Sequence, residues 1–248
     1  MQIEVGGIMD GVKTSVIIPT LNEEHFVGNI LTDLQKQTHK PYEIFVVDGQ
    51  SNDNTQKVVK SFKNITLMNG PRNQGQQRNL AASKAKGEML LFLDADAKID
   101  SDFIEKSLKE MKNRNLNVAI PKYVPYPESN PYFKRFAVVA NFAIAFAAVF
   151  NPYGGASAMF VQKNVFDKTK GFHPRYKLDD VPLIREAAQH GKYGILETHA
   201  YLSERRFLKY GVAKMSIKYF VLYSLLIFNL YEFADKINYQ FGEYERKT

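Results

Sequence analysis

Short runs of apolar residues alternate with longer amphipathic stretches over the first 115 residues of the chain. The apolar runs lie at residues 14–18, 43–47, 65–68 and 89–93. Runs this short and this apolar are typical of buried strands in a parallel sheet. Between them, residues 26–34 and 103–111 repeat apolar side chains at helical spacing. Asn22 is expected to cap the first of these helices, which would begin near Glu23. The alternation predicts an α/β fold with a mostly parallel sheet flanked by helices on both faces.

The pattern changes after residue 115. Prolines interrupt the segment that follows, and residues 136–150 are then apolar apart from one asparagine. A glycine turn at Gly154 and Gly155 leads into another apolar run, and an acidic pair, Asp179-Asp180, precedes a predicted helix. Residues 219–231 form the most apolar run of the chain and carry no charge. This second half therefore adds strands and helices that do not follow the regular alternation of the first.

Two carboxylates follow the apolar run 89–93, in the order Asp94-Ala-Asp96. Ligands of open α/β sheets bind at the carboxyl ends of the strands, and two acids there repel each other unless a cation lies between them. Mg²⁺ or Mn²⁺ takes one or two carboxylates and completes its coordination with phosphate oxygens and water. The pair therefore suggests a metal–diphosphate site. The alternative is that both residues only mark the strand end and cap the next helix.

Charge and cysteine content narrow the classes of partner. The formal net charge is +7 and the pI is about 9.3, which favours an anionic partner such as a phosphate or an acidic membrane face. The basic residues do not form a groove-sized motif with exposed aromatic residues, so we expect no nucleic-acid partner. The absence of cysteine excludes disulfides and thiolate zinc sites and fits a reducing compartment. Residues 1–13 have no apolar core, so we expect no signal peptide there.

Five segments resemble, in order and spacing, the motifs of family 2 glycosyltransferases with the GT-A fold. They are Ile17-Ile-Pro-Thr-Leu-Asn-Glu23, Val46-Val-Asp-Gly-Gln-Ser-Asn-Asp-Asn-Thr55, the helix start from Asn73 to Asn79, Leu93-Asp-Ala-Asp96, and the pair of segments Gly155–Phe160 and Gly171-Phe172…Asp179-Asp180. The resemblance covers roughly residues 13–206 and implies a Rossmann-like GT-A fold. Two positions depart from the family pattern: Gly49 stands where many members have a second Asp, and Asp179 replaces the usual Glu.

The resemblance implies roles on the donor side. Residues that would border or bind the nucleotide are Pro19, Leu21, Glu23, Asp48, Arg78 and Asp94. Arg78 would lie near the diphosphate, and Arg205 and Arg206 partly match a basic element found there. Asp96 would bind Mg²⁺ or Mn²⁺ directly, while Asp94 would bind it through water or hold the sugar or ribose. His199 is a weaker candidate for a further metal ligand, since a lone histidine is more often structural.

On the acceptor side, the resemblance makes Asp180 the base that takes a proton from the acceptor hydroxyl during transfer with inversion. Asp179 and Gly155 would position the acceptor. The alternative is that the acidic pair only complements the dipole of the helix that starts there. If the acceptor is a phosphate, no base is needed and Asp180 only positions it.

The resemblance and the apolar runs together suggest a division of the chain. Residues 1–206 would form the glycosyltransferase domain, with a nucleotide part at 13–115 and an acceptor part at 116–206. Residues 207–248 would form an apolar helical extension that contacts a membrane. As a helix, residues 219–231 would reach only about 20 Å, too short to span a bilayer. The alternative for this run and for 136–150 is a core helix or a dimer interface.

The predicted function is metal-dependent transfer of a sugar from a nucleoside-diphosphate sugar, with inversion. The acceptor would be a polyprenyl phosphate, another lipid-linked molecule or a glycan, and the enzyme would lie at the cytoplasmic face of a membrane. Two alternatives are a degenerate, non-catalytic domain of the same fold and a nucleotidyltransferase. The acidic loop Pro19-Thr-Leu-Asn-Glu-Glu24 argues against the second, because that class needs a basic, glycine-rich loop there. The donor sugar, the nucleobase and the oligomeric state stay open.

Overall fold

The protein is described by a computed structural model over residues 11–155, 157–174, 179–227 and 230–237. In this part of the chain, seven strands form one sheet in the order β3-β2-β1-β4-β6-β5-β7. The strands are β1 (Thr14–Thr20), β2 (Glu43–Asp48), β3 (Thr66–Asn69), β4 (Met89–Leu93), β5 (Val118–Pro125), β6 (Ala158–Gln162) and β7 (Tyr193–Leu202). β6 pairs antiparallel with both β4 and β5, and the other pairs are parallel.

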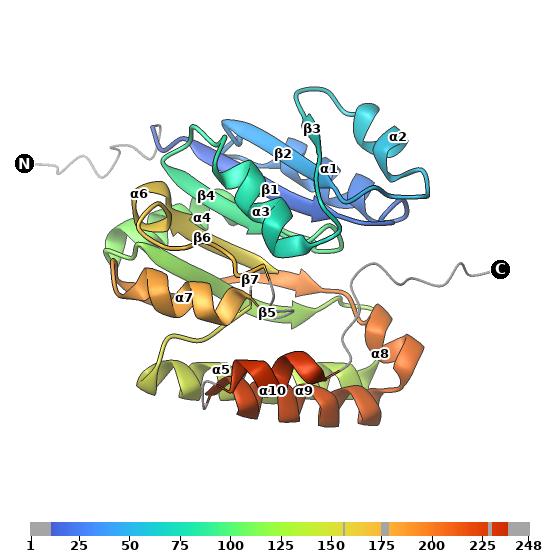
Figure 1. Ribbon diagram of the computed structural model, residues 1–248, viewed down its shortest axis with the longest axis vertical. Coiled ribbons are helices and arrows are strands. Elements are labelled where there is room, and N and C mark those ends of the chain that lie inside the picture. Colours follow the sequence, from blue (N-terminus) through green and yellow to red (C-terminus); the bar gives the residue numbers. More distant parts are fainter. Residues whose placement is uncertain (1–10, 156, 175–178, 228–229, 238–248) are drawn as a thin grey trace, which may run out of the picture.

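The helices range from 4 residues in α6 to 20 in α5, and several lie against the sheet. They are α1 (Val27–Lys36), α2 (Thr55–Lys60), α3 (Gln74–Ala82), α4 (Phe103–Asn113), α5 (Pro131–Phe150), α6 (Lys163–Phe166), α7 (Asp180–Ala188), α8 (Arg205–Tyr210), α9 (Val212–Ile227) and α10 (Tyr231–Lys236). In Figure 1, α3 and α7 lie in front of the sheet, and α5, α9 and α10 form a layer beyond β5. The prediction of a mostly parallel sheet flanked by helices is confirmed.

The core of the sheet consists of its central strands, β1 and β4, in which every residue is buried. Burying one such Leu, Ile or Phe side chain contributes on the order of 1.5–3 kcal/mol, so these continuous apolar runs hold the sheet together. Because β6 is antiparallel to both of its neighbours, β5 runs in the same direction as β4. The carboxyl ends of β1, β2, β4, β5 and β7 therefore meet at one edge of the sheet.

The first helix begins later than predicted. Asn22 has a backbone φ of +56°, and its side-chain oxygen accepts a hydrogen bond from the backbone N–H of Asn52 at 2.9 Å. It thus ties the loop after β1 to the loop after β2, and does not cap α1, which starts at Val27. Asn tolerates this left-handed conformation better than most residues, which explains its place in the turn.

The apolar segments of the second half form helices. Residues 136–150 belong to α5, which is longer than the run itself and begins at Pro131. The run 219–231 is divided between α9 and α10, and residues 228–229 lie outside the described part. A boundary at residue 206 would fall inside α8. Phe207 of that helix packs on Phe133 of α5, with ring centroids 4.6 Å apart. Among the described residues, no helix is both long enough and apolar enough to cross a membrane.

Candidate active site

The polar residues of interest gather where the carboxyl ends of the strands meet. Asp48 is the last residue of β2, and Asp94 follows β4 directly. Arg205 follows β7 as the first residue of α8, and Asp180 is the first residue of α7. Gly155 precedes β6, whose amino end lies at this edge because the strand is antiparallel. Residues far apart in the sequence are thus brought to one edge of the sheet.

Asp94 is held by three side-chain donors. Its Oδ1 accepts hydrogen bonds from Arg78 Nη2 at 2.7 Å and from Gln74 Nε2 at 2.8 Å, and its Oδ2 accepts one from Ser157 Oγ at 2.8 Å. The backbone N–H of Asp94 also donates to the carbonyl of Ser157 at 3.1 Å. Sequence reasoning did not identify Gln74 or Ser157, because neither residue type in its local context signals a carboxylate partner. Their contacts fix the orientation of the first carboxylate of the pair.

Asp96 faces an arginine. Oδ2 of Asp96 lies 2.9 Å from Arg205 Nε, and the two Nη atoms of the same guanidinium donate to the Glu23 carboxylate at 2.8 and 3.0 Å. The guanidinium also lies over the Phe26 ring, 4.7 Å from its centroid. Glu23 is 3% exposed, so its charge requires a partner such as this. Arg205 therefore neutralises two carboxylates, that of Glu23 in the loop after β1 and that of Asp96 in the loop after β4.

Asp48 is fully buried, and its contacts lie within the protein. Its Oδ2 accepts hydrogen bonds from the N–H of Ser51 at 3.0 Å and from Gln56 Nε2 at 2.7 Å, and its Oδ1 accepts one from Ser51 Oγ at 2.5 Å. These bonds shape the turn between β2 and α2. Pro19 and Leu21, also expected near the nucleoside, are buried beside this turn. Thr20 Oγ1, 3.4 Å from Oδ1 of Asp48, is a fourth donor. A carboxylate has about four acceptor positions, so a nucleotide contact with Asp48 would have to replace one of these bonds.

Arg78 connects the donor and acceptor sides. Its side chain is almost wholly buried, with Nη2 on Asp94 and Nη1 3.7 Å from Oδ1 of Asp179. The guanidinium also lies over the Phe172 ring, 5.1 Å from the centroid. A guanidinium so enclosed is well placed to orient two carboxylates. This arrangement lets Arg78 orient both carboxylates, and the diphosphate contact that the resemblance implies stays a prediction.

Asp179 is a buried acid with an unusual pKa. Burial raises the pKa of Asp179 to about 7; Arg78 lowers it, while Asp180 and Asp94 raise it further. Its carboxylate lies against the first turn of α3 at Gly75, where any Cβ would collide with it. Glycine at position 75 is thus required by close packing. Asp179 has a structural place between α3 and α7, whatever part it takes in acceptor binding.

Asp180 and Gly155 line a cavity of about 180 Å³ together with Asp94 and Asp96. The other wall of the cavity is apolar and aromatic and comes from α5, α8 and α9. Its residues include Phe133, Phe136, Ala140, Ile144, Phe207 and Tyr219. The Tyr123 hydroxyl lies within hydrogen-bond distance of the Gly155 carbonyl and of the Ala158 carbonyl, at 3.0 Å from the second, and its one proton is shared between them. Burial raises the pKa of Tyr123 well above its usual value, so this donor stays protonated.

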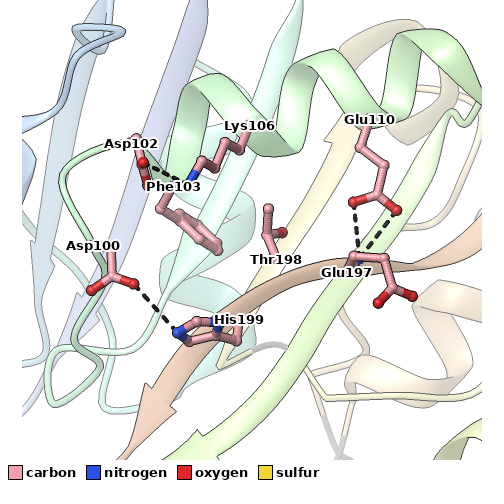
Figure 2. Close-up of a pocket in the computed structure, with 8 residues that line it drawn as sticks. All are labelled: Asp100, Asp102, Phe103, Lys106, Glu110, Glu197, Thr198 and His199. Carbon is pink, nitrogen blue, oxygen red and sulfur yellow. Dashed lines mark hydrogen bonds and ion pairs between the residues drawn. The ribbon is translucent and has the colours of Figure 1, made fainter.

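His199 lies away from this cavity, and the side chain of Arg206 is not described. His199 lines a different cavity, of about 330 Å³, between α4 and β7, and this cavity shares no lining residue with that of Asp180. Figure 2 shows His199 directed at Asp100, 3.3 Å away, with Glu110 turned toward the backbone of Glu197. His199 thus does not lie with Asp94 and Asp96, where a further metal ligand would be needed. Arg206 lies in α8, and its side chain is outside the described part.

Asp94 and Asp96 could hold a metal ion only if other ligands complete its coordination shell. Among the described residues, no three His, Asp or Glu side chains gather closely enough to hold a metal by themselves. Mg²⁺ and Mn²⁺ need only one or two carboxylates when phosphate oxygens and water complete the shell. Asp96 faces the Arg205 guanidinium, so a metal ion at this carboxylate would have to displace that cation or share the carboxylate with it. The donor set fits a divalent cation that binds together with a diphosphate.

Sequence comparison places residues 15–172 in the family Glycosyl transferase family 2. The chain is 24% identical over 212 residues to the glycosyltransferase GlyG of Streptococcus pneumoniae, which covers 77% of this chain and 70% of GlyG. It is 30% identical over 119 residues to UDP-Glc:alpha-D-GlcNAc-diphosphoundecaprenol beta-1,3-glucosyltransferase WfgD of Escherichia coli. That match covers 46% of this chain and 47% of WfgD, so the chain spans about half the length of this relative.

Two solved structures share the fold. Residues 1–349 of S. aureus TarS in complex with UDP-GlcNAc match with a TM-score of 0.62 and 20% identity, over 78% of this chain and 59% of that one. The mannosyltransferase PcManGT from Pyrobaculum calidifontis, in complex with GDP-Man and Mn²⁺, matches with a TM-score of 0.63 and 20% identity, over 77% and 56% of the two chains. The family match, which spans more than half of the chain, and the shared fold confirm the prediction: this protein belongs to glycosyl transferase family 2 and has a GT-A-type fold.

Proposed function

We propose that this chain transfers a sugar from a nucleoside-diphosphate sugar to an acceptor, at the cavity lined by Asp94, Asp96 and Asp180. The observation that carries the proposal is the meeting of the acidic pair after β4 with the acidic start of α7 around one cavity. WfgD, which this chain matches over 47% of its length, takes UDP-glucose according to its name, and TarS binds UDP-GlcNAc. Both support a nucleotide-sugar donor.

On the donor side, Pro19, Leu21, Glu23 and Asp48 would border the nucleoside, and Arg205 and Arg206 would approach the diphosphate. Asp96 would hold Mg²⁺ or Mn²⁺, with Asp94 holding the sugar or a metal-bound water. When bound, the metal supplies positive charge that stabilises the leaving diphosphate. The Mn²⁺ in PcManGT supports a divalent cation in this fold. Arg78 would keep Asp94 in place and lie near the diphosphate.

On the acceptor side, the Asp180 carboxylate would take the proton of the attacking hydroxyl. The acceptor oxygen forms a bond to the anomeric carbon of the sugar while the bond to the diphosphate oxygen breaks, and the configuration inverts. The proton ends on Asp180, and the nucleoside diphosphate leaves. With a phosphate acceptor, already an oxyanion, the same attack needs no base and Asp180 only orients the acceptor.

The apolar wall of the cavity supports a lipid-linked acceptor. Phe133, Phe136 and Phe207 pack together with ring centroids 4.6 to 6.4 Å apart, directly beside the polar side of the cavity. An acceptor that carries both a sugar or phosphate and a hydrocarbon chain would match both walls. The diphosphoundecaprenol in the name of WfgD agrees with such an acceptor. We propose that the enzyme acts at the cytoplasmic face of a membrane, where such an acceptor would lie.

The test is a panel of nucleotide sugars offered with Mg²⁺ or Mn²⁺ and either a polyprenyl phosphate or a soluble glycan, with release of nucleoside diphosphate as the readout. Asp180→Asn is expected to reduce turnover with a hydroxyl acceptor about 10²- to 10⁴-fold without loss of donor binding. Asp102→Asn, at the residue before α4 that pairs with Lys106, is the matched control. Donor-dependent thermal stabilisation without transfer to any acceptor would instead favour the degenerate domain.

A further inference from the structure

The outer sides of α5 and α9 expose an apolar surface, here called the helical face. On α5 it consists of Val138, Val139, Phe142, Phe146 and Val149, and on α9 of Ile217, Phe220 and Val221. Phe142 and Phe220 are each 74% exposed, so most of each residue packs against nothing else in the described part of the chain. Large apolar side chains gathered on one exposed surface commonly mark an interaction site.

Both helices turn this surface away from the rest of the protein. The buried residues of α5, such as Phe133 and Ile144, line the active-site cavity, and its exposed residues lie on the opposite side of the helix. On α9, Met215 and Leu222 are buried, while Phe220 lies on the other side. Tyr219 of α9 reaches Phe136 of α5, with ring centroids 6.2 Å apart, so the two helices are neighbours. Figure 1 shows them in one layer at the edge of the molecule.

The charges of these helices are all positive. The sequences of α5, α8 and α9 contain no Asp or Glu. Their exposed cations include Lys134 and Arg135 at the start of α5, Lys209 in α8 and Lys214 in α9. An apolar stripe bordered by basic residues matches the surface of a bilayer with anionic headgroups. The apolar side chains contact the hydrocarbon, and the basic side chains contact the headgroups.

A second copy of the chain fits this surface less well. In a two-fold dimer the same patch meets itself, so the cations of α5, α8 and α9 would face one another without an acid from these helices between them. Anionic lipid headgroups supply the missing negative charge. The exposed stripes run along the helices, which suits helices lying in the plane of the membrane interface.

We propose that the helical face docks on the surface of a bilayer that contains anionic lipids, with α5 and α9 lying in the interface. This deepens the proposed function, because the inner sides of the same helices line the cavity of Asp180. A helix with its side chains is about 10–12 Å across, so docking brings that cavity within roughly one helix of the lipid. A lipid-linked acceptor would then reach the site without leaving the membrane.

The test is flotation of the full chain with vesicles of phosphatidylcholine alone or with added phosphatidylglycerol, without donor or acceptor. Binding is expected to need the anionic lipid and to fall with salt. The double variant Phe142→Ser/Phe220→Ser is expected to lose at least tenfold in partitioning. Lys134→Gln, Lys209→Gln and Lys214→Gln should each cost about fivefold. Tyr42→Ser, at an exposed aromatic residue before β2, is the matched control and should bind as the unaltered chain does.

Three results would overturn the proposal: no binding to either vesicle, equal binding by the double variant, or a solution dimer that the double variant dissociates. Thermal unfolding checks that each variant is folded, and both Phe side chains lie outside the core. Because flotation uses no sugar donor, it can fail while transfer to a soluble acceptor succeeds. Vesicle binding can also be observed for a protein that transfers no sugar. The two experiments therefore distinguish failure of this inference from failure of the proposed function.

Discussion

Asp179 allows a direct test of the electrostatics at the site, through replacement by asparagine. Asp179 is 5% exposed, and its cationic neighbour Arg78 lies 3.7 Å away and also pairs with Asp94 at 2.7 Å. Asparagine has nearly the same shape and cannot ionise. The substitution therefore removes the cost of a buried charge while leaving the packing against Gly75 almost unchanged.

The magnitude follows from the pKa. Burial raises the pKa of Asp179 from 3.8 to about 7 in the folded protein. At pH values between these two, the unfolded chain has already released the proton and the folded chain still holds it, so stability falls as the pH rises. Each pKa unit corresponds to about 1.4 kcal/mol. The contribution of Asp179 to the free energy of unfolding is therefore about 4 kcal/mol smaller above pH 7 than below pH 4.

The assay is urea unfolding of both proteins from pH 5 to pH 8. The unfolding free energy of Asp179→Asn relative to the unaltered protein is expected to rise by roughly 3 kcal/mol over this range, because only the unaltered protein must ionise the buried acid. Asp167→Asn is the control, since that carboxylate is 52% exposed and pairs with Lys163 on the surface. A difference between Asp179→Asn and the unaltered protein that does not change with pH would refute the reasoning.

Two further predictions concern neighbouring residues. Arg205→Met removes the guanidinium beside Asp96, so binding of Mn²⁺ alone, followed by electron paramagnetic resonance, is expected to tighten about tenfold; unchanged affinity would mean that Arg205 does not compete for this carboxylate. Gly75→Ala forces a Cβ against the Asp179 carboxylate and is expected to destabilise the fold by roughly 1–3 kcal/mol in urea unfolding. Gly11→Ala, where a Cβ meets nothing, serves as its control, and equal stability of the two variants would contradict the packing argument.

Local pattern was sufficient for the framework of the fold. The apolar runs of β1 and β4 predict buried strands because runs this short and apolar on both faces are typical of a parallel sheet, and the structure buries every residue of both. The alternation with amphipathic helices then implies a parallel sheet. The placement of Asp94 at a strand end followed from the same reasoning. These properties depend on side-chain periodicity over a few residues, which the sequence displays directly.

The second half was less predictable. Its strand β6 inserts antiparallel between β4 and β5, and no local pattern specifies which strands it joins. The run 219–231 is uniformly apolar, so nothing in its periodicity indicated that α9 and α10 would divide it. Asn22 is a residue type that commonly caps helices. In the structure it has a left-handed backbone conformation, and its side chain instead accepts a hydrogen bond from the loop after β2.

By itself, the sequence determined the class of fold, the order of the motifs and the acids that gather at the edge of the sheet. Only the tertiary structure decided which cation faces each acid. Arg205 pairs with Glu23 across 182 positions of sequence, and Arg78 lies enclosed between Asp94 and Asp179. Such pairs form because a buried charge must find a counter-charge within a few ångströms, and the folded backbone alone sets which residues come that close.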